Sequence, residues 1–100
     1  MIVNYKEIMQ DVIKFYGADL QQIIAIEEMS ELQKEICKNK RGRDNIDHIA
    51  EEIADVLICI DQLQIMFDIK ERVEEWKDKK ARRVLKQMLE DISQQENEKC

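Results

Sequence analysis

The sequence predicts an all-α protein whose protomer has four helices and completes its core by homo-oligomerisation. Proline is absent and glycine occurs only at Gly17 and Gly42 among 100 residues, whereas a sheet-rich fold needs more turn residues than that. Ile, Leu, Val and Met supply most of the apolar content, and aromatic residues make up only 5%. A chain of this length forms one small domain. We assign residues 1–93 to that domain.

The first two helices are predicted from apolar residues at three- and four-residue steps. One helix covers about residues 2 to 16, and Gly17 ends it. Asp19 can cap the second helix, which runs to about Lys38. The apolar stripe of the second helix consists of Ala25, Met29, Leu32 and Ile36, and Glu28 and Glu35 fall at its edge, with Glu31 slightly further round.

The third predicted helix, about residues 46 to 67, is apolar on nearly all sides. A basic segment with Gly42, residues 39–45, is the one loop before it, and Asp44 is a candidate cap. The short loop makes the second and third helices antiparallel neighbours. One stripe of the third helix comprises Ile49, Val56, Ile60, Leu63 and Phe67, and another comprises Ala54, Ile58 and Ile65.

Two apolar faces on one helix of so small a protein can both be buried only if a second chain covers one of them. We therefore expect a homo-oligomer with the third helix central to the interface. Because a chain this short must borrow core from its partners, we expect a tetramer built as a pair of dimers rather than a dimer.

The fourth predicted helix, about residues 69 to 91, is more polar. Its inward-facing residues are predicted to be Val73, Trp76, Val84 and Met88. The last stretch, residues 94–100, lacks apolar periodicity, so we expect a frayed C-terminal tail there.

Composition excludes several classes of protein. A formal charge of −6 argues against a nucleic-acid binder, which normally has a basic surface. The longest unbroken apolar run, residues 56–60, is far too short to cross a membrane. Three cysteines without close spacing indicate reduced thiols rather than a disulfide framework or a zinc site. We therefore expect a cytoplasmic protein that binds neither nucleic acid nor membrane.

The functional prediction rests on two acidic motifs, residues 27–31 and 51–55. Each lies in an otherwise apolar helical run, where an unpaired carboxylate is costly to bury. The pairs Glu28/Glu31 and Glu52/Asp55 are spaced i, i+3, so each projects from one side of its helix. Single pairs of this kind usually lie on solvated helix surfaces. Here both pairs lie at similar distances from the same short loop, so four oxygen donors can converge on Mg²⁺, with Mn²⁺ as a possible substitute.

A di-iron site of the ferritin type is the natural rival for carboxylates on paired helices. It requires a Glu-x-x-His motif on two helices. The chain has one histidine, His48, and Asn45 stands three residues before it. The di-iron interpretation therefore fails.

The two acidic motifs resemble the signature of the all-α nucleoside triphosphate pyrophosphohydrolases, specifically the small MazG-like proteins, which are related to the dimeric dUTPases. That signature is E-E-x-x-E followed, after a variable spacer, by E-x-x-D. It is matched by Glu27-Glu28-Met29-Ser30-Glu31, then 20 residues, then Glu52-Ile53-Ala54-Asp55. With the apolar continuation at residues 56–60, the resemblance covers about residues 20 to 67.

The resemblance implies Mg²⁺-dependent cleavage of a nucleoside triphosphate between the α- and β-phosphates, giving the monophosphate and pyrophosphate. This activity would serve nucleotide-pool house-cleaning. It implies that Glu28, Glu31, Glu52 and Asp55 are the metal ligands and that Glu27 either contacts a ligand without binding the metal itself or positions the general base. Either Glu31 or Glu28 would take the proton from the attacking water.

Basic residues are candidates for contacts with the phosphates. In the family, residues of the last helix commonly meet the distal phosphates, which here implies Lys77, Lys80 and Arg83, while Lys34 lies one turn beyond Glu31. The Lys/Asn/Arg pattern of the dUTPase relatives is not matched here. Basic runs of this kind are more often solvated surface, and the basic loop at residues 38–43 is a second candidate.

A non-catalytic function is the alternative. An acidic helical oligomer could bind a protein partner through its third helix or its C-terminal tail. Such a module would gain no stability from a divalent metal, whereas an enzyme with the predicted site would.

Overall fold

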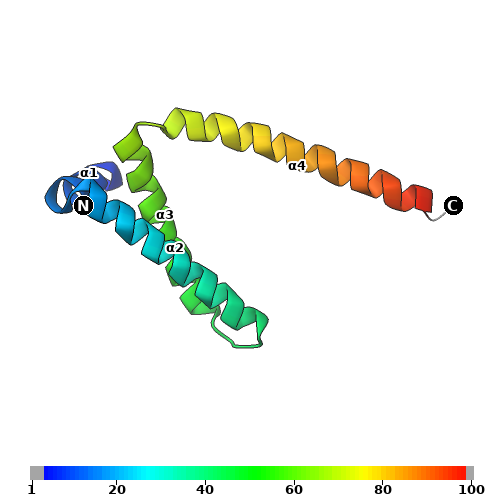
Figure 1. The fold of residues 1–100 in the computed structure, drawn as a ribbon, viewed down its shortest axis with the longest axis horizontal. Coiled ribbons are helices and arrows are strands. Elements are labelled where there is room, and N and C mark those ends of the chain that lie inside the picture. The colour runs from blue at the N-terminus through cyan, green and yellow to red at the C-terminus, as the bar shows by residue number, and fades with distance from the viewer. Residues whose placement is uncertain (1–3, 99–100) are drawn as a thin grey trace. The chain divides into compact units, whose positions relative to one another are not determined.

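The computed structural model describes residues 4–98, and these residues contain four helices and no strand. The helices are α1 (Tyr5–Tyr16), α2 (Ala18–Lys40), α3 (Ile46–Phe67) and α4 (Lys70–Glu98), as Figure 1 shows. The predicted all-α class is therefore confirmed. The chain divides after Asp68 into two compact units. The first contains α1, α2 and α3, and the second contains α4.

The junction between α1 and α2 is a single residue, Gly17. The side chain of Asn4 accepts a hydrogen bond of 3.2 Å from the backbone N–H of Glu7 and so caps the start of α1. At its other end the N–H of Gly17 donates to the carbonyl of Ile13 at 2.8 Å. Gly17 has φ 93°, a left-handed value that glycine adopts without steric cost. The predicted stop at Gly17 is confirmed, while the predicted start at residue 2 lies outside the described residues.

The predicted caps of α2 and α3 are both wrong. Gly17 is the N-cap of α2, and Asp19 lies in its first turn, where its charge complements the helix dipole. Asn45 rather than Asp44 is the N-cap of α3. The Asn45 side chain points back to α2, where its amide Nδ2 donates to the carbonyl of Glu35 at 2.9 Å and to Glu35 Oε2 at 2.6 Å. A buried asparagine therefore closes the loop between α2 and α3.

The pairing of α2 with α3 forms the centre of the first unit, and α1 contacts both helices (Figure 1). Far from the loop, buried Gln21 donates through Nε2 to Oε1 of buried Gln62 at 3.0 Å. Gln62 in turn donates to Met9 Sδ at 3.6 Å, which connects α1 to the pair. Buried Gln62 thus contacts both of the other helices of this unit.

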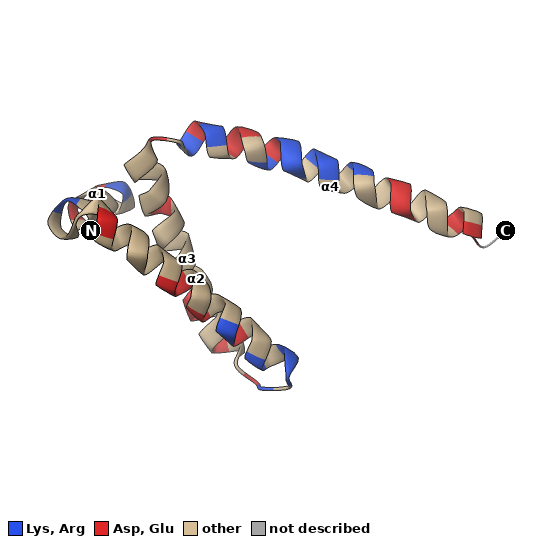
Figure 2. Cartoon of the chain, viewed as in Figure 1, with Lys and Arg blue, Asp and Glu red and all other residues tan. Residues whose placement is uncertain are grey.

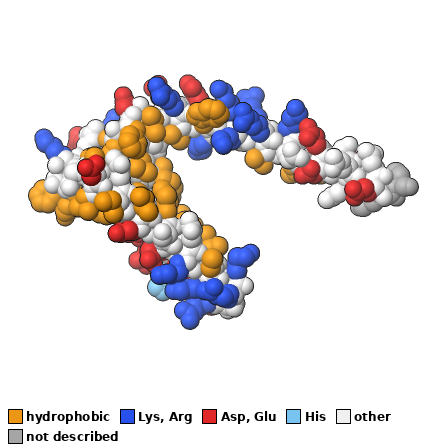
Figure 3. All heavy atoms as spheres, in the orientation of Figure 1, with side chains coloured by type: hydrophobic (Ala, Val, Ile, Leu, Met, Phe, Trp, Pro, Cys, Tyr) orange, Lys and Arg blue, Asp and Glu red, His pale blue; other side chains and the backbone are white. Residues whose placement is uncertain are grey.

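The apolar core of a single protomer is very small. Among the described residues only Ala25 and Cys59, at 2% and 5% exposure, are buried apolar residues. On α3 most of the first predicted stripe is half-buried, but Phe67 is exposed, as are Ile58 and Ala54 from the second stripe. Leu57 is 56% exposed. Figure 3 shows apolar side chains gathered on the surface of the α1–α3 unit.

Helix α4 differs from its prediction at its end and in its burial. It continues to Glu98, beyond the predicted end at residue 91, and so includes most of the segment expected to fray; residues 99 and 100 are not described. No residue of α4 is buried. Val73 is half-buried, but Trp76, Val84 and Met88 are exposed rather than inward. Periodicity identified an apolar face on this helix, but periodicity does not specify what covers such a face.

None of the helices among residues 4–98 combines the length and the apolar character that a membrane span requires.

Replacing Asn45 by Ala should lower the free energy of unfolding by about 1–2 kcal/mol, because two hydrogen bonds from a buried amide to Glu35 are lost. Urea denaturation followed by circular dichroism would measure the change. Asn39→Ala is the matched control, since Asn39 lies in the same region and donates one long bond of 3.4 Å to the carbonyl of Arg43. Equal losses in the two variants would contradict this role of Asn45.

Candidate metal centre

Three carboxylates meet where α2 lies beside α3. Glu28 comes from α2, and Glu52 and Asp55 come from successive turns of α3. One oxygen from each of the three lies within 4.8 Å of the other two. All three side chains are half-buried, and Figure 2 shows acidic residues on both helices in this region. We call these three residues the acidic cluster.

The electrostatics of the acidic cluster disfavour three negative charges. The pKa of Glu28 is raised, first by burial, then by the charges of Asp55 and Glu52 and by a side-chain hydrogen bond with Asp55. The pKa of Glu52 is raised by burial and then by the charges of Asp55 and Glu31. Both shifts have the direction expected where like charges share a partly desolvated site. The cluster therefore favours either a proton or a bound cation.

One oxygen of the acidic cluster has no hydrogen-bond partner among residues 4–98. Glu52 Oε2 is buried and accepts no hydrogen bond from the described residues. A buried, unpartnered carboxylate oxygen is costly, and a metal ion is one of the few groups that removes the cost. The donors are all carboxylate oxygens, the type that hard divalent cations take. The residues present therefore fit a metal ion of that kind.

Two of the predicted site residues lie outside the acidic cluster. Glu31 has an exposed side chain, at 49%, and pairs with Lys34 Nζ at 3.7 Å. Its charge still contributes to the raised pKa values of Glu28 and Glu52, so it lies at the rim of the site. Glu27 is exposed and is not a member. The structure thus brings together three of the four predicted ligands.

The predicted phosphate-binding residues are all exposed. Lys34 lies on α2 beside Glu31. Lys77, Lys80 and Arg83 lie on α4, which belongs to the second unit. Figure 2 shows Lys and Arg positions in blue along the first half of this helix. The second candidate, the basic loop at residues 38–43, forms a blue surface at the end of the α2–α3 pair in Figure 3.

Glu35 and Asn45 are part of the surroundings of the site, and sequence reasoning gave neither a role in it. The pKa of Glu35 is lowered by hydrogen bonds from Asn45 and from Lys38, whose Nζ lies 3.1 Å from Glu35 Oε1. The charge of Glu35 contributes to the raised pKa of Glu52. The available signal was spacing, because Glu35 lies two turns after Glu28 on the same side of α2.

Cys59 lies on the other side of the acidic cluster, one turn after Asp55. It is buried, as the sequence predicted, and its pKa is raised by burial and then by the charges of Glu28 and Asp55. A thiol with a raised pKa stays protonated at neutral pH. Cys59 therefore adds no charge on this side of the acidic cluster.

In the presence of chelator, Glu28→Gln should stabilise the protein near pH 7 and change it little near pH 4. Glu28 has a raised pKa, so it favours folding below its unfolded value of 4.5, and this contribution is lost as pH rises through the folded-state pKa. Melting temperatures from pH 4 to 8 would measure the effect, with exposed Glu27→Gln as the matched control. A pH slope in Glu28→Gln as steep as in the unsubstituted protein would contradict the assignment.

The contribution of Glu35 to stability should change with pH in the opposite direction in the same experiment. Its lowered pKa stabilises the fold above 4.5, and that stability is lost as pH falls through its folded-state pKa. The two effects therefore occupy different pH ranges and can be separated.

Comparison of the chain with known protein families, with curated proteins and with solved structures found no match.

Proposed function

We propose that this protein is a Mg²⁺-dependent nucleoside triphosphate pyrophosphohydrolase of the MazG-like type. The observation that carries the proposal is the convergence of Glu28, Glu52 and Asp55, which come from both acidic motifs, to within 4.8 Å. Two motifs separated by 20 residues in the sequence contribute to one acidic cluster, as the resemblance to this family requires.

We assign each residue of the site a role from its position. Glu28, Glu52 and Asp55 would hold the cation, Mg²⁺ with Mn²⁺ as a substitute. When bound, such a cation lowers the pKa of a water molecule and offsets negative charge on phosphate oxygens. Glu31 lies at the rim, outside the three-residue cluster, so we assign it the acceptance of the water proton, with Glu28 as the other candidate. Exposed Glu27 would orient that base.

Basic residues would bind the triphosphate. Lys34 pairs with Glu31 at the rim of the acidic cluster, so its ammonium group lies within reach of an anion held there. Lys77, Lys80 and Arg83 would meet the distal phosphates, as the family resemblance implies. A triphosphate is repelled by the carboxylates until a cation bridges the two, so substrate and metal should bind together.

We also propose that the antiparallel α2–α3 pair completes its core in a homo-oligomer, with a tetramer favoured over a dimer. The support is the small core of the protomer and the exposed apolar residues of α3, including Leu57 and Ile58. Light scattering that returned the mass of one 12.0 kDa chain at micromolar concentration would contradict this proposal.

The function is tested by pyrophosphate release from a panel of ribo- and deoxyribonucleoside triphosphates, with Mg²⁺ and with excess chelator. We expect release only with the metal. Glu52→Gln and Asp55→Asn should each lower kcat/KM by about 100-fold or more, because each removes a ligand from an acidic cluster of three. Exposed Glu51→Gln, next to Glu52 on the same helix, is the matched control. Full activity in both ligand variants would show that the assigned site is wrong.

Thermal melts with Mg²⁺ separate the enzyme from the non-catalytic alternative. A ligand that binds only the folded state stabilises it by about 2.7 kcal/mol at 100 times its dissociation constant. Mg²⁺ should therefore raise the melting temperature of the unsubstituted protein and not that of Glu52→Gln. Stabilisation without pyrophosphate release would indicate a different substrate, whereas neither effect would favour the interaction module.

A further inference from the structure

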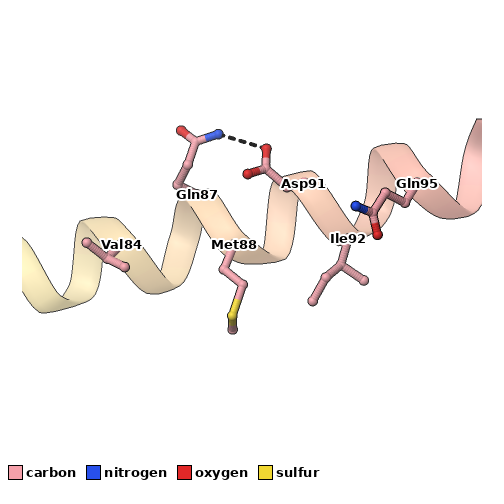
Figure 4. A pocket seen from close by; sticks show the side chains of 6 residues that line it. All are labelled: Val84, Gln87, Met88, Asp91, Ile92 and Gln95. Atoms are coloured by element: carbon pink, nitrogen blue, oxygen red, sulfur yellow. Dashed lines mark hydrogen bonds between the residues drawn. The ribbon is translucent and has the colours of Figure 1, made fainter. Parts of the chain in front are cut away.

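Helix α4 carries an exposed apolar strip that the proposed function does not use. The strip consists of Val84, Leu85, Met88, Leu89 and Ile92, all between 43% and 69% exposed. Part of it forms a shallow groove, lined by Val84, Gln87, Met88, Asp91, Ile92 and Gln95. In Figure 4, Met88 and Ile92 project from one side of the helix, whereas Gln87 and Asp91 project from the opposite side and are joined by a hydrogen bond of 3.0 Å.

The spacing of the strip is that of a helix–helix contact. Val84, Met88 and Ile92 follow one another at four-residue steps, and Leu85 and Leu89 do the same beside them. Such rows lie along one face of a helix and pack into the grooves of a second helix. At 29 residues, α4 is about 44 Å long, which is long for a helix without a single buried residue.

Charge is distributed asymmetrically about the centre of this strip. The preceding basic segment, residues 77–86, has six Lys or Arg residues and one acidic residue, Asp78. In the following acidic segment, residues 87–98, the four charged residues are all Asp or Glu. Figure 2 shows this change of sign along α4. The apolar strip spans the boundary between the two segments.

We propose that the apolar strip of α4 binds the same strip of a second copy of this chain, with the two helices antiparallel and centred on Met88. In this arrangement Met88 faces Met88, and Val84 faces Ile92 of the second copy. The basic segment of each helix then lies against the acidic segment of the other. One surface patch serves both partners, as a two-fold axis requires.

The charge distribution selects this arrangement over a parallel one. Parallel helices would place basic segment against basic segment and acidic against acidic, which is repulsive at both ends. The antiparallel pair instead aligns the basic segment of each copy with the acidic segment of the other at both ends. This contact differs from the proposed interface on α3, and it does not depend on the enzymatic activity.

Disulfide trapping tests the contact in the full-length chain. In a Cys37→Ser, Cys100→Ser background that keeps buried Cys59, Met88→Cys should form a disulfide-linked dimer on mild oxidation at micromolar concentration. Ala81→Cys is the matched control. Two copies of residue 81 would lie about 21 Å apart along the antiparallel pair, beyond the reach of a disulfide.

A second variant establishes the direction of the helices. Residues 81 and 95 lie seven residues before and after Met88, so the double variant Ala81→Cys, Gln95→Cys should form cross-linked dimers that Ala81→Cys alone does not form. If Met88→Cys gives no more disulfide-linked dimer than Ala81→Cys, the proposal is overturned. The apolar strip would then bind another part of its own chain or a different partner. Equal trapping at both positions would show a parallel pair and would overturn it as well.

Discussion

The first unit depends on one contact, the packing of α2 against α3, which has a buried hydrogen-bonded side chain near each end and the acidic cluster between them. Near the loop, the Asn45 amide bonds to the carbonyl and carboxylate of Glu35. At the far end, Gln21 bonds to Gln62 within the helix pair. Between these two ties stand Glu28, Glu52 and Asp55. The hydrogen bonds of Asn45 and Gln21 therefore keep α2 and α3 together on either side of carboxylates that repel one another.

This arrangement explains why a protein can retain a costly cluster of carboxylates. Removing the charge would relieve repulsion and stabilise the fold, so the acidic residues are not there for stability. A cation bound between them, as proposed, would offset this repulsion. Carboxylates thus occupy part of the α2–α3 contact, and among the described residues only Ala25 and Cys59 are buried apolar residues.

Much of the fold was predictable from sequence because helices leave local signals. The stop at Gly17 and the loop containing Gly42 followed from residue type alone. The choice of Asn45 over Asp44 as the cap did not, because it depends on a hydrogen bond to Glu35, ten residues earlier in the chain. The exposure of Trp76 and Met88 could not be predicted either, since periodicity identifies an apolar face and not its partner.

In the candidate site, too, local spacing was predictable and contacts with other segments were not. The i, i+3 spacing predicted that Glu52 and Asp55 would share a side of α3, and the structure confirms it. Spacing also predicted Glu31 as a fourth ligand, but the structure places it outside the acidic cluster, because a residue at the edge of a stripe can instead pair with a lysine at the surface. The Glu31 side chain is exposed and pairs with Lys34. Glu35 was missed because its partner Asn45 lies on another segment.

The single-residue corner at Gly17 has a consequence for how the unit opens. With no linker between α1 and α2, the last turn of α1 and the first turn of α2 share hydrogen bonds through Gly17, whose N–H binds Ile13 and whose carbonyl accepts from Gln21. Fraying at this junction therefore disturbs the same Gln21 that bonds to Gln62. In hydrogen-exchange terms, the end of α1, the start of α2 and the end of α3 should open as one cooperative unit, while the opposite end of the helix pair remains held by Asn45.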